Sequence, residues 1–190
     1  MIKKILIFIS LCLTLTSCST KPERTEAKVV SNPLGISKST YNVNDYYQVY
    51  RDGRIYVFDD FKVYQSFLEL GEATFRLTRI GAGPKGETVV FGLRKADKKK
   101  PMLSGVVNMY DGKVSGIKEG FYAEVILDER VYIFGQWADL QAFLNAGKAT
   151  YRYTDIAAGT KGVTLVYVLN KKNKRQKPVV LMNEYKKRHQ

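Results

Sequence analysis

The sequence predicts an α+β fold in which two tandem ββαββ-like repeats, residues 41–110 and 111–190, form a pseudo-twofold domain of helices on an antiparallel sheet. The first observation is an internal repeat: at an offset of about 76, residues 46–100 align without a gap to 122–176, and about 24 of some 55 pairs are identical. The second is periodicity, because each copy changes from strand-like to helix-like spacing and back. A unit of about 60 residues is marginal alone, so we expect the two to share a core or a continuous sheet.

A β-hairpin is expected to open each repeat. In "YYQVYRDGRIYVF", Asp52-Gly53 separates two runs rich in aromatic and β-branched residues. This dipeptide is a strong hairpin signal because both turn positions need positive φ. The second copy has Asp128-Glu129 there, so the first turn is the tighter prediction.

A short amphipathic helix is expected next. "DDFKVYQSFLELG" offers Asp60 as N-cap, apolar residues at helical spacing, and Gly71 just past the end. "GQWADLQAFLNAG" repeats this pattern and ends at Gly147.

The glycine-rich segment "GAGPKGET" lies between two β-like runs, residues 74–80 and 88–94. A Walker-type phosphate loop leads into a helix and ends in Gly-Lys-Ser/Thr, whereas here Lys85 precedes Gly86 and a strand follows. We interpret the segment as a hairpin loop. The alternative is a nest of backbone amides that binds an anion beside Lys85 and, in the second copy, Lys161.

Each repeat closes with a basic loop and a proline, "RKADKKKP" and then "NKKNKRQKP". The following segments, "MLSGVVNMY" and "VVLMNEYKK", favour short helices with proline as a tolerated first residue. Their β-branched residues leave a strand as the alternative.

Residues 1–17 are typical of a secretory signal peptide. Two lysines precede an apolar run from Ile5 to Leu15, which at about 11 residues is shorter than the roughly 20 that span a bilayer. The end of the run, Leu15-Thr16-Ser17-Cys18, resembles the lipobox of bacterial lipoproteins. This resemblance implies that Cys18 begins the mature chain and carries acyl groups such as palmitate. Ser19 then implies sorting to the outer membrane, facing the periplasm. The alternative is an ordinary signal with a chance cysteine.

Residues 18–40 are expected to form a flexible, lipidated tether. They are rich in Ser, Thr, Lys and Glu, contain Pro22 and Pro33, and lack sustained periodicity.

Composition argues against several catalytic chemistries. The two cysteines are Cys12, within the signal, and Cys18, so no free thiol is expected in the folded part. The single histidine, His189, precedes the last residue and is expected to fray. We therefore predict no enzyme activity, no metal site and no cofactor.

One carboxylate pair, Asp59-Asp60, could in principle do acid-base chemistry. The helix cap accounts for it, and the second copy has Gly135-Gln136 instead.

The net charge of +13 favours anionic partners, and export makes nucleic acid the least expected of them. Candidate binding residues are the loop cations and one aromatic residue that differs between the copies. They are Lys85, Lys161, Lys98, Lys99, Lys100, Lys171, Lys172, Lys174, Arg175 and Trp137. The alternative is that the basic loops are merely solvated hairpin tips.

The repeated unit from Arg54 to Leu93, with its "IGAGPKGETVVFG" hairpin, resembles a module of uncharacterised bacterial envelope proteins. Arg130 to Leu169 carries the same pattern with Thr160 and Tyr167 in place of Pro84 and Phe91. The resemblance implies the architecture and transfers no activity.

These features together predict a non-catalytic, lipid-anchored binding protein of the periplasm and outer membrane. One form is an immunity or inhibitor protein that neutralises an envelope-targeted toxin. The alternative is an envelope-maintenance lipoprotein that binds anionic lipid, lipopolysaccharide or peptidoglycan. Its expected partners are thus the membrane, through Cys18, and either a periplasmic protein or an anionic envelope component.

Overall fold

The computed structural model describes residues 41–190. The predicted signal peptide, the lipobox with Cys18, and the tether of residues 18–40 lie outside the described residues. Within residues 41–190, none of the helices has both the length and the apolar character needed to cross a membrane.

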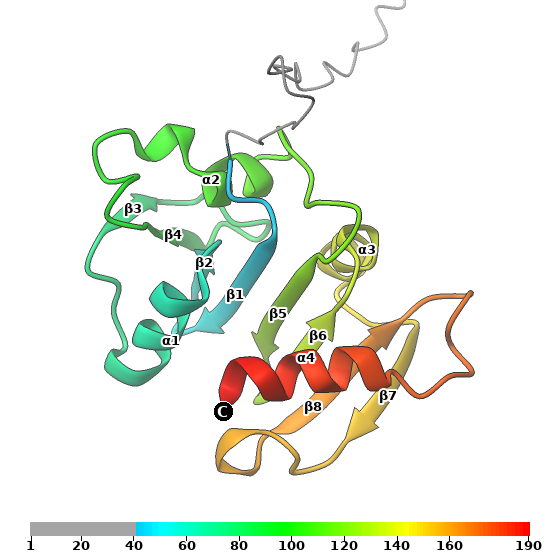
Figure 1. The fold of residues 1–190 in the computed structure, drawn as a ribbon. Helices are drawn as coiled ribbons and strands as arrows, with labels where there is room; N and C mark the ends of the chain where they lie inside the picture. Colours follow the sequence, from blue (N-terminus) through cyan, green and yellow to red (C-terminus); the bar gives the residue numbers. More distant parts are fainter. Residues whose placement is uncertain (1–40) are drawn as a thin grey trace, which may run out of the picture.

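A single eight-stranded sheet organises the described residues, in the order β3-β4-β2-β1-β5-β6-β8-β7 (Figure 1). The first half comprises β1 (Asp45–Arg51), β2 (Arg54–Phe58), α1 (Phe61–Leu70), β3 (Arg76–Arg79), β4 (Thr88–Gly92), a 3-10 turn (Pro101–Leu103) and α2 (Gly105–Tyr110). The second half comprises β5 (Tyr122–Leu127), β6 (Arg130–Phe134), α3 (Trp137–Ala146), β7 (Tyr151–Asp155), a 3-10 turn (Thr160–Gly162), β8 (Thr164–Leu169) and α4 (Val179–His189).

The predicted α+β class is confirmed, but the prediction of an antiparallel sheet is wrong. The hairpins β1–β2 and β5–β6 are antiparallel, as are the pairs β3–β4 and β7–β8. However, β2 pairs with β4, β6 with β8, and β1 with β5 in parallel. In each half a helix and an antiparallel strand lie between the second strand and its parallel partner, the fourth strand. Side-chain alternation along a strand does not encode the direction of that strand.

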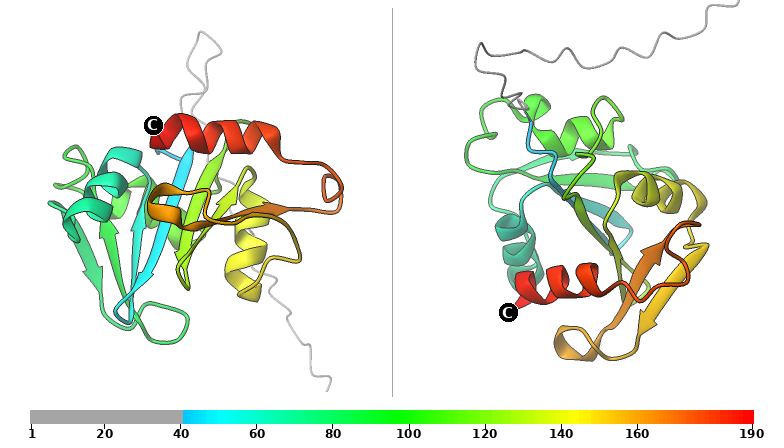
Figure 2. Two further views of the ribbon diagram at one scale, coloured as in Figure 1. Left: turned by 90° about the horizontal axis from the view of Figure 1, so that it is seen from below. Right: turned by 45° about the vertical axis from the view of Figure 1, so that its right-hand side comes forward.

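The two halves meet through the parallel pair β1–β5, where Asp45 lies opposite Tyr122 and Val49 opposite Ile126. Both faces of the sheet are covered by helices (Figure 2). α1 and α4 cover one face, where Phe67 and Tyr185 join the same apolar cluster. α2 and α3 cover the other, where Val107 and Phe143 do so. The first and second helix of each half therefore lie on opposite faces.

The local predictions agree with the structure at the turns. Asp52 and Gly53 have φ of 52° and 68°, and Asp128 and Glu129 have 50° and 60°. Glu129 thus adopts the left-handed region despite its side chain, so the second hairpin turn is as short as the first.

Helix boundaries also agree. The amide of Val63 donates to Asp60 Oδ1 at 3.1 Å, which caps α1. α1 and α3 end at left-handed glycines, Gly71 and Gly147. Both segments after the prolines are helical, as the favoured interpretation required.

Candidate functional site

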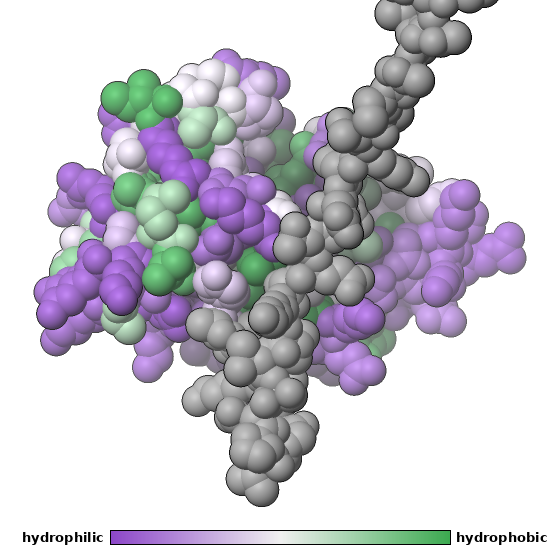
Figure 3. Space-filling view, turned by 90° about the horizontal axis from the view of Figure 1, so that it is seen from above, coloured by the Kyte–Doolittle hydropathy of each residue, from purple (hydrophilic) through white to green (hydrophobic). Residues whose placement is uncertain are grey.

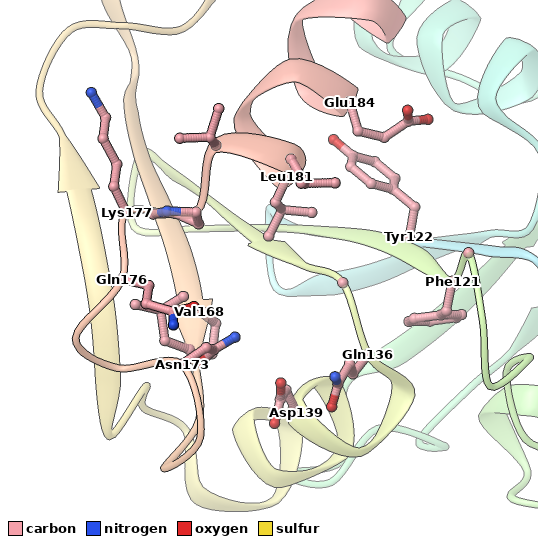
Figure 4. A pocket seen from close by; sticks show the side chains of 16 residues that line it. Phe121, Tyr122, Gln136, Asp139, Val168, Asn173, Gln176, Lys177, Leu181 and Glu184 are labelled. Atoms are coloured by element: carbon pink, nitrogen blue, oxygen red, sulfur yellow. The ribbon is translucent and has the colours of Figure 1, made fainter.

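A cleft of about 670 Å³ lies between the first turns of α3 and α4 (Figure 4). The start of β5, the residue after β6, the end of β8 and the loop between β8 and α4 form the rest of its wall. Its lining residues are Gly120, Phe121, Tyr122, Gly135, Gln136, Asp139, Val168, Leu169, Asn173, Gln176, Lys177, Pro178, Val179, Val180, Leu181 and Glu184. Its volume falls in the range of small-molecule and cofactor sites, about 300–1,000 Å³.

The corresponding place in the first half is occupied by a carboxylate. Asp59, which aligns with Gly135, is 1% exposed, and its Oδ2 accepts a hydrogen bond from the amide of Val106 at 2.9 Å. Asp59 thereby ties the end of β2 to the first turn of α2. The sequence interpretation assigned the Asp59-Asp60 pair to the cap of α1. That holds for Asp60 but is wrong for Asp59, whose partner lies on the opposite face of the sheet.

Gly135 leaves this place empty in the second half, and the fold itself does not require a glycine there. Its φ is outside the left-handed region. A Cβ at this position would lie 3.6 Å from the nearest side-chain atom, on Leu181, which is an ordinary van der Waals contact. Neither the backbone conformation nor the packing therefore accounts for a glycine at this position.

Two carboxylates stand on opposite sides of the cleft. Asp139, in the first turn of α3, accepts a hydrogen bond from the amide of Asn170 at 3.0 Å. Glu184, on α4, accepts one from Arg188 Nε at 2.9 Å. The guanidinium of Arg188 also makes two bonds to Asp45, at 3.1 and 3.2 Å, so one cation serves two carboxylates.

Behind the cleft lies a buried polar network centred on Glu124, which has no exposed surface. The hydroxyl of Tyr122 donates to Oε1 at 2.6 Å, and that of Tyr64 to Oε2 at 3.0 Å. Nε2 of His189 lies 2.7 Å from Oε1. Tyr122 also lines the cleft, so the network forms part of its inner boundary.

Aromatic rings hold this network in place. His189 stacks on Tyr185, with ring centres 4.2 Å apart, and meets Phe61 of α1 edge-on at 5.2 Å. Arg188 lies 4.2 Å above the ring of Tyr122. The prediction that His189 frays is therefore wrong: α4 folds back across the sheet and places the last residues of the chain against α1.

We assign the Glu124 network to anchoring α4, not to ligand binding. Glu124 is wholly enclosed and holds three partners, so neither of its oxygens is accessible from the cleft. A buried carboxylate is retained only when such partners replace its hydration.

Asp59 is a buried carboxylate whose pKa is strongly shifted. Burial raises its pKa to about 7, although Arg94 nearby and the bond from Val106 lower it. The guanidinium Nε of Arg94 lies 3.9 Å from Oδ1, and that oxygen has no hydrogen-bond partner.

The predicted basic site residues lie apart from one another. Lys98 Nζ lies 5.2 Å above Phe75, next to edge strand β3, and Lys174 Nζ lies 4.7 Å above Tyr151 of the opposite edge strand β7. Hydrophilic side chains gather at both edges in Figure 3. All of the predicted cations are exposed: Lys85, Lys98, Lys99, Lys100, Lys161, Lys171, Lys172, Lys174 and Arg175. The fold thus forms two separate basic edges.

The glycine-rich loops do not present an open nest of amides. In the second loop Gly159 donates to the carbonyl of Val163 and Gly162 to that of Gly159, both at 3.0 Å. Gly83 donates to the carbonyl of Glu87 at 2.9 Å and Gly86 to that of Gly83 at 3.0 Å. The amide of Lys85 donates to the side chain of Glu87 at 2.8 Å. Because the loop closes on itself between β3 and β4, the hairpin interpretation is the correct one.

Trp137 serves the core. Its ring meets Tyr46 edge-on at 5.9 Å and Phe121 at 5.5 Å. It begins α3 beside the cleft but is not one of the lining residues, so the prediction that it contacts a partner gains no support. Residues 41–190 also contain no group of three or more metal-ligating side chains suited to an ion.

Sequence reasoning missed both Glu124 and the cleft. A glutamate within the strand sequence "YAEVIL" was one available signal, because a charge at an inward position needs buried partners. The change from Asp59-Asp60 to Gly135-Gln136 was the other. Comparison with known protein families, with curated proteins and with solved structures found no match, so the function is inferred from the residues of this chain alone.

Proposed function

We propose that this chain is a non-catalytic, lipid-anchored protein of the bacterial outer membrane that binds a partner protein on the periplasmic side. The observation that carries the proposal is the cleft between α3 and α4, which opens where Gly135 and Gln136 replace Asp59 and Asp60. Apolar side chains at its rim add to this surface: Val179 is 52% and Val180 85% exposed. Exposed apolar side chains beside a concave site are typical of protein-binding surfaces.

The proposal includes a duplicated ββαββ unit whose copies have diverged. Both halves have the same order of strands and helix, and the aligned sequences support common descent. The first copy keeps Asp59 as a structural tie to α2, and the second has given up that tie for a binding cleft.

Anchoring follows from the lipobox. An acylated Cys18 would hold the chain at the bilayer, because each buried methylene contributes about 0.8 kcal/mol. A flexible tether over residues 18–40 would let the domain stand off by about 25 Å. The concrete form we favour is an immunity or inhibitor protein against an envelope-targeted toxin. Loss of the gene should then make a strain sensitive to its sister cells, and an insensitive deletion strain would refute that form.

Site-specific photo-crosslinking in intact envelopes tests the binding function itself. A benzophenone amino acid at Val180, on the cleft rim, should yield a discrete adduct with one protein. Ile80 is the matched control, since it is also apolar and 90% exposed but lies in the β3–β4 loop at the far edge of the sheet. Equal adducts from both positions, or none from Val180, would refute a partner at the cleft.

The basic edges favour a second candidate function, binding of anionic lipid, lipopolysaccharide or peptidoglycan. Its supporting observation is that the cations of both loops are exposed. If the protein without its acyl groups ignores anionic vesicles and wall sacculi at low salt, this function is refuted.

A further inference from the structure

We infer that the cleft recognises a partner segment that carries a lysine or arginine side chain next to an apolar residue. This inference rests on the proposed function, because it names the chemistry of the partner that the cleft would bind. It is carried by the combination of an apolar wall and excess negative charge in one cavity.

The apolar wall is formed by the last residues of β8 and the first turn of α4. Val168 and Leu169 line one side, and Leu181 projects into the cleft from α4 (Figure 4). Gly135 beneath Leu181 provides the room. A partner side chain of apolar character would cover this surface and remove it from water, which stabilises a complex by about 25 cal/mol for each Å² buried.

The negative charge comes from Asp139 and Glu184. The partner of Asp139 is the neutral amide of Asn170, so its charge is not neutralised within the cleft. Glu184 shares the guanidinium of Arg188 with Asp45. The single lysine of the lining, Lys177, is directed away from both carboxylates in Figure 4, and its Nζ lies 5.9 Å above the ring of Tyr153. The cleft therefore holds more negative than positive charge.

This acidic lining belongs to a chain whose net charge is +13. The loop that supplies Asn173, Gln176 and Lys177 to the lining also carries Lys171, Lys172, Lys174 and Arg175, but these four cations do not line the cleft. A cationic side chain that enters the cleft therefore finds a carboxylate on either wall, Asp139 on one and Glu184 on the other. Charge complementarity of this kind selects partners more than it adds raw affinity. Arginine suits the place best, since its planar guanidinium binds carboxylates with two parallel hydrogen bonds.

Side-chain amides at the rim complete the chemistry. Gln136, Asn173 and Gln176 line the cleft, and each carries both donor and acceptor groups. Amides of this kind pair with peptide groups, which favours an extended stretch of polypeptide beside the inserted side chain.

Three capped tripeptides serve as probes: acetyl-Leu-Arg-Leu-amide and its Gln and Glu counterparts at the central position. Saturation-transfer NMR would follow them with the full acylated protein in nanodiscs. We expect the dissociation constant of the Arg peptide to be at least fivefold lower than that of the Gln peptide, and the Glu peptide to be weakest. Equal affinities, or preference for Glu, would overturn the inference.

Variants locate the binding. Asp139→Asn keeps an acceptor for Asn170 and should erase most of the preference for arginine. Asp128→Asn removes the same charge from the β5–β6 turn, at the other end of the strands, and should leave the preference for arginine intact.

Gly135→Leu should fill the cleft and lower affinity for the Arg peptide at least tenfold, with Gly135→Ala as its small control. Binding that survives Gly135→Leu with the protein folded would place the peptides elsewhere and overturn the inference.

The outcomes separate the two proposals. A crosslinked partner at Val180 together with no arginine preference would leave the binding function standing and refute the inferred chemistry. Arginine-selective binding in the cleft without any crosslinked protein would refute the proposed protein partner and leave the inferred chemistry of the cleft standing.

Discussion

Nε2 of His189 lies 2.7 Å from the carboxylate of Glu124, so the penultimate residue of the chain is bonded to the central strand pair of the sheet. Glu124 sits on β5 next to the junction with β1, and His189 ends α4. The same imidazole also packs against Phe61 of α1, so the end of α4 in the second half contacts the first half of the chain.

Replacement of His189 by alanine should therefore lower the free energy of unfolding by about 1–3 kcal/mol, since it leaves buried Glu124 with one partner fewer. Urea unfolding at pH 7 would measure the loss. Lys187→Ala is the matched control, because Lys187 is exposed on the same helix. A loss no greater than that of the control would show that the terminus is not fixed by this bond.

The sequence predicted those features that local chemistry determines. The turn at Asp52-Gly53, the cap at Asp60 and the stop at Gly71 each depend on residues within one or two turns of chain, and all three are present. The direction of β4 relative to β2 depends on where the chain re-enters the sheet, and no short pattern encodes that.

The candidate site escaped prediction for a related reason. Glu124 acquires its partners from Tyr64 and His189, which are 60 and 65 residues away along the chain. The cleft lies where Gly135 lacks a side chain. A glycine in a sequence signals such a space only when it is compared with the aligned residue of the other repeat, here Asp59. By contrast, the lysines that composition made prominent are spread over two distant edges of the sheet.

Asp59 should make stability depend on pH. Its pKa is raised from 3.8 to about 7 by burial, so the folded state holds a proton that the unfolded state releases above about pH 4. The contribution of this proton to the free energy of unfolding is fully present below pH 3.8 and is lost as the pH rises through 7. Asp59→Asn cannot ionise and should gain up to about 4 kcal/mol over the wild type between pH 4 and 8, at about 1.4 kcal/mol for each pKa unit. Chemical unfolding at several pH values would test this, and a constant difference would contradict the shift.

Two glycine-to-alanine substitutions should have opposite effects. Gly135→Ala should raise stability by about 0.4–1 kcal/mol, because its Cβ makes only an ordinary contact with Leu181 and the unfolded chain loses freedom. Gly105→Ala should destabilise, because its Cβ would collide with the backbone oxygen of Asn42. The midpoints of thermal unfolding of the two variants and of the wild type would test both effects. Destabilisation by Gly135→Ala would mean that the fold itself needs this glycine, which would remove the main reason for assigning its absent side chain to the cleft.

Charge reversal at the basic edges should reveal whether they bind anything. Replacing Lys171, Lys172 and Lys174 by glutamate changes exposed residues of one loop, so each change should cost under about 0.5 kcal/mol in stability. If an anionic envelope component binds there, affinity for anionic vesicles should fall and depend less on salt, because fewer counterions are displaced. The same reversal at Lys98, Lys99 and Lys100 reports on the other edge, and flotation of vesicles at low and physiological salt measures both.

Since the two loops flank opposite edge strands, a single flat membrane would engage them unequally, and one reversal should lower vesicle binding more than the other. Unchanged flotation after both reversals would mean that the loops are solvated tips, and only the cleft would remain as a binding surface.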